Sequence, residues 1–152
     1  MVNNIYSKKV ISHFRNPHNY GKMKNPSAVG KVGNILCGDV MYLYIKVGEN
    51  DIIKDIKFET FGCVAAISTS SVVTDLAKGK TLGEALKIDS KEIVKSLGGL
   101  PSIKYHCSLL GADALSEAIY DYLSKNKRLI PKELQKRHER IEKEKVDLKI
   151  NN

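Results

Sequence analysis

The sequence predicts an α+β domain, in which helices pack on one face of a small three-stranded antiparallel sheet, plus a charged C-terminal helix. Apolar residues alternate with polar ones between residues 41 and 60, which is typical of half-buried strands. After residue 63 the apolar residues recur at helical spacing, and no strand pattern returns. Strands followed by helices favour a sheet covered by helices over a βαβ repeat.

The N-terminal segment, residues 5–15, is expected to form a short amphipathic helix. Tyr6, Val10 and Phe14 are four residues apart and would share one buried face. Pro17 follows, and a proline disfavours helical geometry in the residue before it. We therefore expect this helix to end near residue 15 and to pack through its apolar face.

Three strands are expected after an irregular stretch rich in Pro, Gly and Asn. Residues 29–36 predict the first strand, although Gly30 and Gly33 weaken it. Residues 41–47 and 55–60 alternate apolar and polar side chains on either side of a Gly-containing turn. These two strands are therefore predicted to form a hairpin.

Four helices are expected in the next part of the chain. The first follows Cys63 and stops at a Lys-Gly pair beginning at Lys78. Two short helices are predicted at residues 82–85 and 90–97. A break rich in Gly and Pro separates them from a longer helix that begins at Ser108.

The last segment, residues 126–152, is predicted to be a charged helical extension of a domain that spans residues 1–125. It has nine Lys and Arg against five Asp and Glu, so it supplies half of the net charge of +8. Its few apolar positions, such as Leu134 and Ile141, predict a solvated helix that is frayed or forms only against a partner. It has no aromatic residue, which counts against nucleic-acid binding.

Composition narrows the class of protein further. The longest apolar runs are far too short to span a membrane, and the N-terminus has no secretion signal. We therefore expect a cytoplasmic protein with no membrane association. Three cysteines, an odd count, argue against a disulfide framework and for reduced thiols.

Each cysteine lies at a break between predicted elements. Cys63 and Cys107 are at predicted helix N-termini, where a thiol pKa of about 8.5 can fall to roughly 3.5–7.5. Any one of these cysteines alone would be explained equally well by packing in the core. However, His106 adjoins Cys107, and Asp39 lies two residues after Cys37. Thiolates with an imidazole and a carboxylate suit zinc or iron–sulfur centres, not magnesium or calcium.

Three segments resemble the signatures of the IscU family, which is the same module as the N-terminal domain of NifU. They are residues 37–41 (CGDVM), 61–63 (FGC) and 100–108 (LPSIKYHCS). The resemblance covers residues 5–125 and implies a scaffold without turnover of its own. Such a scaffold assembles a 2Fe-2S cluster from ferrous iron and persulfide sulfur. A cysteine desulfurase supplies the sulfur, a ferredoxin-type donor the electrons, and apo-proteins accept the cluster.

The resemblance also implies roles for individual residues. The thiolate ligands would be Cys37, Cys63 and Cys107. His106 would be an alternative or fourth ligand, and Asp39 would tune the lability of the cluster. Lys104 would lie at the edge of the site. Cys107 is also the expected first persulfide acceptor, because its position at the start of a helix favours the thiolate.

Some positions depart from the family pattern. Ser102 replaces a second proline in the segment that contacts a dedicated Hsp70-type chaperone, which counts against that partnership. Val64 stands where the family usually has glycine, so we expect a narrower approach to the site. His106 is present and the insertion typical of the zinc-dependent SufU branch is absent, which favours the IscU branch.

Two other functions remain open from the sequence. The same residues could form a zinc site, because three cysteines and one histidine are a common closed zinc set, and such scaffolds can hold zinc when purified in air. The basic charge also permits a nucleic-acid-binding module, against which the tail's composition argues. His13, His18 and His138 lie outside the signatures and are predicted to be surface residues.

Overall fold

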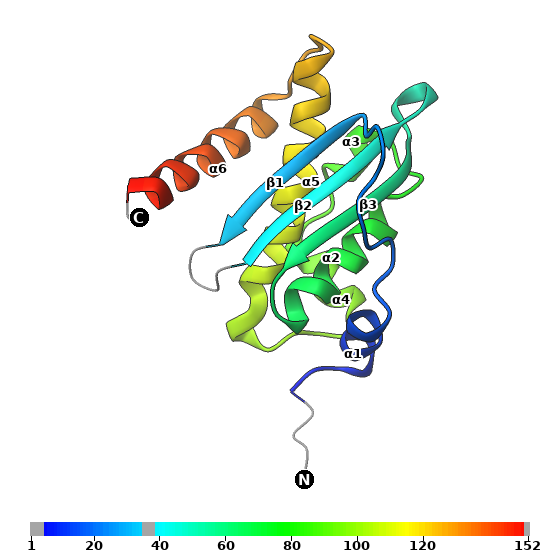
Figure 1. The fold of residues 1–152 in the computed structure, drawn as a ribbon, viewed down its shortest axis with the longest axis vertical. Coiled ribbons are helices and arrows are strands. Elements are labelled where there is room, and N and C mark those ends of the chain that lie inside the picture. Colours follow the sequence, from blue (N-terminus) through cyan, green and yellow to red (C-terminus); the bar gives the residue numbers. More distant parts are fainter. Residues whose placement is uncertain (1–4, 35–38, 151–152) are drawn as a thin grey trace.

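The computed structural model describes residues 5–34 and 39–150, and they form the predicted α+β fold (Figure 1). Three antiparallel strands lie in the order β1-β2-β3. The elements in chain order are α1 (Lys8–Arg15), β1 (Ala28–Asn34), β2 (Asp39–Val47), the 3-10 turn η1 (Glu49–Asp51), β3 (Ile53–Phe61), α2 (Val64–Ala77), α3 (Leu82–Ala85), α4 (Ser90–Ser96), the 3-10 turn η2 (Ser102–Lys104), α5 (Tyr105–Lys125) and α6 (Lys132–Ile150).

The predicted alternation along β2 and β3 is confirmed. Met41, Leu43 and Ile45 are fully buried, and Leu43 pairs with the equally buried Phe58 of β3. These side chains face the helices behind the sheet, where α5 packs on β1 and β2, and α2 packs on β3 (Figure 1). The core of the domain therefore lies between one face of the sheet and these two helices.

The central helix α5 begins at Tyr105, three residues before the predicted start, and it is buried on most of its surface. Its backbone lies against Gly30 of β1, where an added Cβ atom would come within 2.1 Å of the carbonyl oxygen of Ala114. Gly30 was expected only to weaken the strand. Instead, it allows the backbones of β1 and α5 to approach each other closely.

The first helix is shorter than predicted, and the predicted inward face is buried at Val10 but not at Phe14. Ser7 caps α1 by accepting a hydrogen bond from the amide of Val10, which is fully buried. Phe14, predicted to share that buried face, is exposed. The reason is that α1 packs on α2, and at this turn the side chain that meets α2 is His13, with its Nδ1 2.7 Å from the hydroxyl of Ser71.

The C-terminal helix α6 packs on α5 of the same chain through one face, while most of its described side chains are exposed, as predicted for a solvated helix. Leu134 and Ile141 are buried, and Arg140 forms an ion pair with Asp113 of α5 at 2.8 Å. These contacts are distant in sequence, which is why the composition of α6 alone did not predict them. Across the part of the chain that the structure describes, no helix is both long enough and apolar enough to cross a membrane.

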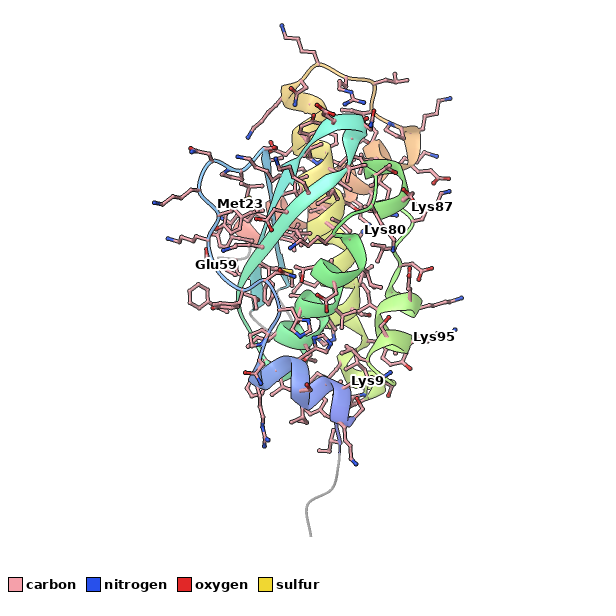
Figure 2. The ribbon with its side chains drawn as sticks, turned by 90° about the vertical axis from the view of Figure 1, so that its right-hand side faces the viewer. Lys9, Met23, Glu59, Lys80, Lys87 and Lys95 are labelled. Carbon is pink, nitrogen blue, oxygen red and sulfur yellow. The ribbon has the colours of Figure 1, made fainter. Side chains whose placement is uncertain are left out.

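The helical side of the molecule carries outward-pointing lysines, seen after a quarter turn in Figure 2. In this view α1 lies at the base, beside the lower end of α2. The lysines labelled there are Lys9, Lys80, Lys87 and Lys95. These lysine side chains point away from the apolar layer between the sheet and the helices.

Candidate metal centre

Cys63 lies where the sheet meets its first covering helix. It is the N-cap residue of α2, two residues after β3 ends at Phe61, and its carbonyl accepts the amide hydrogen of Ile67. The side chain is half-buried. The thiol is therefore close to the unpaired amides of a helix N-terminus, which favour a negative charge.

Cys107 is in the first turn of α5, just after the 3-10 turn η2, and it is fully buried. Its carbonyl accepts a hydrogen bond of 3.2 Å from the hydroxyl of Thr69 in α2. Both partners are buried, so this bond ties the first turn of α5 to α2. This hydrogen bond thus helps to position α5, which carries Cys107, against α2, which begins after Cys63.

The sulfur of Cys107 has two close neighbours that can bind metal. The Sγ atoms of Cys63 and Cys107 are 3.8 Å apart, and Nε2 of His106 is 3.5 Å from the Sγ of Cys107. For a tetrahedral ion with bonds of about 2.3 Å to sulfur and about 2.05 Å to nitrogen, these separations would be about 3.8 Å and about 3.5 Å. Each pair therefore has the spacing of two ligands on one ion.

Tyr6 and Lys104 are within electrostatic reach of these thiols. Burial raises the pKa of Tyr6, the charges of Cys63 and Cys107 raise it further, and Lys104 lowers it. Lys104 was predicted to lie near the site, whereas Tyr6 was predicted mainly to pack. No sequence pattern linked Tyr6 to the cysteines, because α1 reaches them through its packing on α2.

Two of the predicted ligands are described in part or not at all. Cys37 lies outside the described residues. Asp39 opens β2, with its backbone paired to Asn34, and its side chain is not described. The next residue of β2, Val40, pairs with Phe61 of β3, so β2 starts at the end of the sheet that leads to Cys63. Among the predicted ligands, the structure thus places Cys107 next to Cys63 and next to His106.

Large apolar side chains are exposed in the two segments that carry the described thiols. Phe61 is 78% exposed and precedes Cys63 by two residues, while Ile103 is 77% exposed in η2, just before α5. Tyr105 and Leu109 are also exposed on either side of Cys107. Exposed apolar groups of this kind are typical of surfaces that bind other proteins.

The remaining histidines differ in their surroundings. His18 is exposed, as predicted. His13 and His138 are half-buried, so the prediction that they are surface residues is only partly right. His138 stacks on Tyr120 with ring centroids 3.6 Å apart, and its Nδ1 is 2.7 Å from a carboxylate oxygen of Glu117. It therefore helps to attach α6 to α5.

Comparisons with known proteins found similar sequences over most of the chain. The family described as NifU-like N terminal domain matches residues 5–129. The "Iron-sulfur cluster assembly scaffold protein IscU 1" of Archaeoglobus fulgidus is 54% identical over 146 residues, covering 94% of this chain and 95% of the relative. The scaffold protein IscU of Aquifex aeolicus is 48% identical over 125 residues, covering 82% of this chain and 80% of the relative.

Solved structures show the same fold. A putative iron-sulfur cluster assembly scaffold protein for the SUF system from Fervidobacterium islandicum has a TM-score of 0.64 and 26% identity, covering 76% of this chain and 96% of that one. The N-terminal NifU-like protein of Brucella abortus has a TM-score of 0.63 over 80% of this chain and 96% of its own. At 23% identity the second likeness concerns the fold alone.

Proposed function

This chain belongs to the NifU-like N-terminal domain family, and from that membership we propose that it is a scaffold for iron–sulfur cluster assembly. Its cargo is a 2Fe-2S cluster built from ferrous iron and sulfur and then passed to apo-proteins. The observation that carries this proposal is the spacing of Cys63 and Cys107, 3.8 Å between sulfurs, with His106 3.5 Å from the second.

We assign the cluster-binding thiolates to Cys37, Cys63 and Cys107. His106 is the neighbouring nitrogen donor, and Asp39 is the carboxylate that makes the cluster labile. Lys104 lies at the edge. Clusters held by four thiolates are the common stable arrangement. A set completed by imidazole or carboxylate holds one iron less firmly, which suits a protein that must release its cargo.

Sulfur arrives from a cysteine desulfurase as a persulfide. The thiolate of Cys107 attacks the outer sulfur of the donor persulfide, the donor's S–S bond breaks, and the donor leaves as a thiolate. Two electrons from a ferredoxin-type donor then reduce the transferred sulfur to sulfide. The chain accepts, binds and hands on these components without being an enzyme itself.

Protein partners must dock close to the thiols for these transfers. The exposed Phe61 and Ile103, in the segments that carry Cys63 and Cys107, support such contacts. Ser102 lies in η2 beside Ile103, where the family often has a second proline. For this reason an Hsp70-type chaperone is the partner for which we see the least support.

Anaerobic reconstitution with ferrous iron, sulfide and reductant tests the scaffold proposal. We expect sulfide-to-iron charge-transfer absorption, and its loss when Cys37, Cys63 or Cys107 is replaced singly by serine. A chain that forms no such chromophore, or keeps it unchanged in all three variants, contradicts the proposal. Circular dichroism of each variant checks that the fold is intact.

The role of Asp39 is tested by the speed of cluster transfer. With Asp39→Ala we expect slower release to an apo-acceptor, because a labile carboxylate position is lost. The measurement is the rate at which the acceptor gains its own chromophore. Equal or faster transfer from the variant rules out this role for Asp39.

A zinc protein is the second candidate, because the same two spacings fit a tetrahedral zinc ion. Metal analysis of protein purified without oxygen separates the candidates. Zinc that iron and sulfide cannot displace favours the zinc protein. Zinc that gives way to the cluster favours the scaffold.

A further inference from the structure

A second group of metal-ligating side chains lies where α1 ends beside α2. It consists of His13 from α1, His18 from the following loop and Asp75 from α2. One ligand atom from each lies within 4.8 Å of the other two. Asp75 is twelve residues after Cys63, or about 18 Å along the helix. This group is therefore separate from the thiols.

One buried hydroxyl contacts the imidazole of His13 and the backbone of His18. The Oγ atom of Ser71, a fully buried residue of α2, is 2.7 Å from Nδ1 of His13. The same atom accepts a hydrogen bond of 2.8 Å from the backbone amide of His18. Hydrogen bonds of this kind behind a ligand fix its direction in metal sites.

The loop that carries His18 is fixed to the sheet and to α2. The amide of Phe58 donates to the carbonyl of Asn19 at 3.0 Å, and the amide of Gly21 donates back to the carbonyl of Phe58 at 2.8 Å. The side-chain amide of Asn19 donates to the hydroxyl of Thr74 at 3.0 Å. His18 is thus held in place beside His13, with ring centroids 4.6 Å apart.

A simple ion pair explains part of this arrangement. Nδ1 of His18 is 2.5 Å from Oδ2 of Asp75, and this pair needs no metal. It involves only two of the three side chains, and the imidazole of His13 lies beside that of His18. A bound cation satisfies all three side chains at once, because neutral imidazole and carboxylate both donate electron pairs to it.

We propose that His13, His18 and Asp75 bind one divalent first-row transition-metal ion. Two imidazoles and one carboxylate with open positions are the set typical of non-haem ferrous iron, and the same donors accept zinc and cobalt. The ion links α1, the loop and α2. Its ligands are nitrogen and oxygen alone, so its spectrum differs from that of an ion on the thiolates.

Cobalt binding to the metal-free full chain tests this proposal. Equilibrium dialysis counts all bound Co²⁺, while thiolate-to-cobalt charge-transfer absorption reports only ions on cysteine. In wild type we expect the total number of bound Co²⁺ ions from dialysis to exceed the number bound to cysteine by one. In His18→Arg the extra ion should bind more than about tenfold more weakly, since even the loss of a residue behind a ligand costs 10–100-fold. The charge-transfer band should be unchanged.

The arginine variant is the matched control for the ion pair. Arginine keeps a positive charge beside Asp75 but has no lone pair to give to a metal. His138→Asn is the second control, because Glu117, His138 and Glu142 form another group of possible ligands. It should keep the extra ion.

Three results would overturn the proposal. The wild type could bind no extra ion, His18→Arg could bind the extra ion as tightly as the wild type does, or His138→Asn could lose the extra ion while His18→Arg keeps it. These outcomes are independent of the scaffold function. Failure of the scaffold proposal would appear as a missing iron–sulfide chromophore in the reconstitution experiment, with the nitrogen and oxygen site unaffected.

Discussion

At Cys107 the position in the helix and the burial of the side chain have opposite effects on reactivity. The first turn of α5 favours the thiolate, but the sulfur is fully buried, whereas that of Cys63 is half-buried. If Cys107 accepts sulfur as proposed, its surroundings must therefore open when the sulfur donor docks. The sequence predicts that both cysteines lie at helix N-termini, but it does not predict how deeply each side chain is buried. This requirement therefore could not be predicted from the sequence.

We predict that Cys107 receives sulfur before the other two cysteines. After incubation with a cysteine desulfurase, mass spectrometry should show one added sulfur atom on the peptide that contains Cys107. Cys107→Ser should abolish this addition, while Cys63→Ser should keep it. Added sulfur on Cys37 or Cys63 alone would assign the acceptor role to another thiol.

Tyr44 has a strongly altered ionisation on the outer face of the sheet. Its hydroxyl donates to a carboxylate oxygen of Glu59 across the strands at 2.6 Å. Burial, followed by this hydrogen bond, raises the pKa of Tyr44 to about 12. Because the unfolded value is about 10, the folded state holds this proton more tightly. The resulting stabilisation is complete below pH about 10 and is lost as the pH rises toward 12.

Tyrosine absorbance followed against pH checks this prediction. A group that ionises near pH 12 should disappear in Tyr44→Phe. In Glu59→Gln its pKa should fall toward the ordinary value, because the charged acceptor is gone. If the late ionisation persists in Tyr44→Phe, it does not belong to Tyr44, and if it is unchanged in Glu59→Gln, the hydrogen bond to Glu59 is not its cause.

At the scale of elements, β1 and α5 meet through a glycine. A Cβ atom added at Gly30 would lie 2.1 Å from the carbonyl oxygen of Ala114 and 2.6 Å from the amide nitrogen of Ala118. Both contacts are with backbone, so a side chain cannot turn away. We expect Gly30→Ala to lower the free energy of unfolding by about 1–3 kcal/mol, the usual cost of overpacking. Urea denaturation gives the value.

Gly83 provides the matched control within α3. An added Cβ atom there meets nothing within 4 Å, so alanine fits and favours the helix. Gly83→Ala should therefore leave stability unchanged or raise it by up to about 1 kcal/mol. Equal effects of the two substitutions on stability would mean that β1 and α5 can move apart enough to accommodate the added methyl group at residue 30.

The elements themselves were largely predictable from local patterns. Alternation gave β2 and β3, because one face of these strands is buried and the other is not. The start of α5 was missed, since the three residues from Tyr105 to Cys107 carry no apolar period of their own. The packing of α6 was missed because Leu134 and Ile141 are too few to indicate a buried face without knowledge of α5.

For the whole molecule, the site depends on contacts that the sequence signatures do not contain. The signatures identified Cys63, His106 and Cys107 as chemistry-bearing residues, and the structure places Cys107 next to each of the other two. Their distances arise from the packing of α2 on α5, including the bond from Thr69 to the carbonyl of Cys107. Tertiary contacts of this kind produce no regular spacing of residues in the sequence. The sequence therefore predicted the site residues but not the distances between them.

The proposed division between residues 1–125 and the charged extension leads to the last prediction. A chain that ends at Ile130 retains all of α5 and the ion pair between Arg128 and Asp51. It loses the burial of Leu134 and Ile141, each worth about 1.5–3 kcal/mol. We therefore expect a folded chain that is several kcal/mol less stable in urea.

Cluster reconstitution in the shortened chain should remain close to that of the full chain, since the described ligands lie on α2 and the first turn of α5. The full-length double variant Leu134→Ala/Ile141→Ala is the control, because it removes the apolar contact and keeps the nine Lys and Arg of residues 126–152. Equal destabilisation of the two proteins attributes the stability to apolar packing. A folded, shortened chain that forms no cluster, beside a double variant that does, would show that the charged extension takes part in assembly.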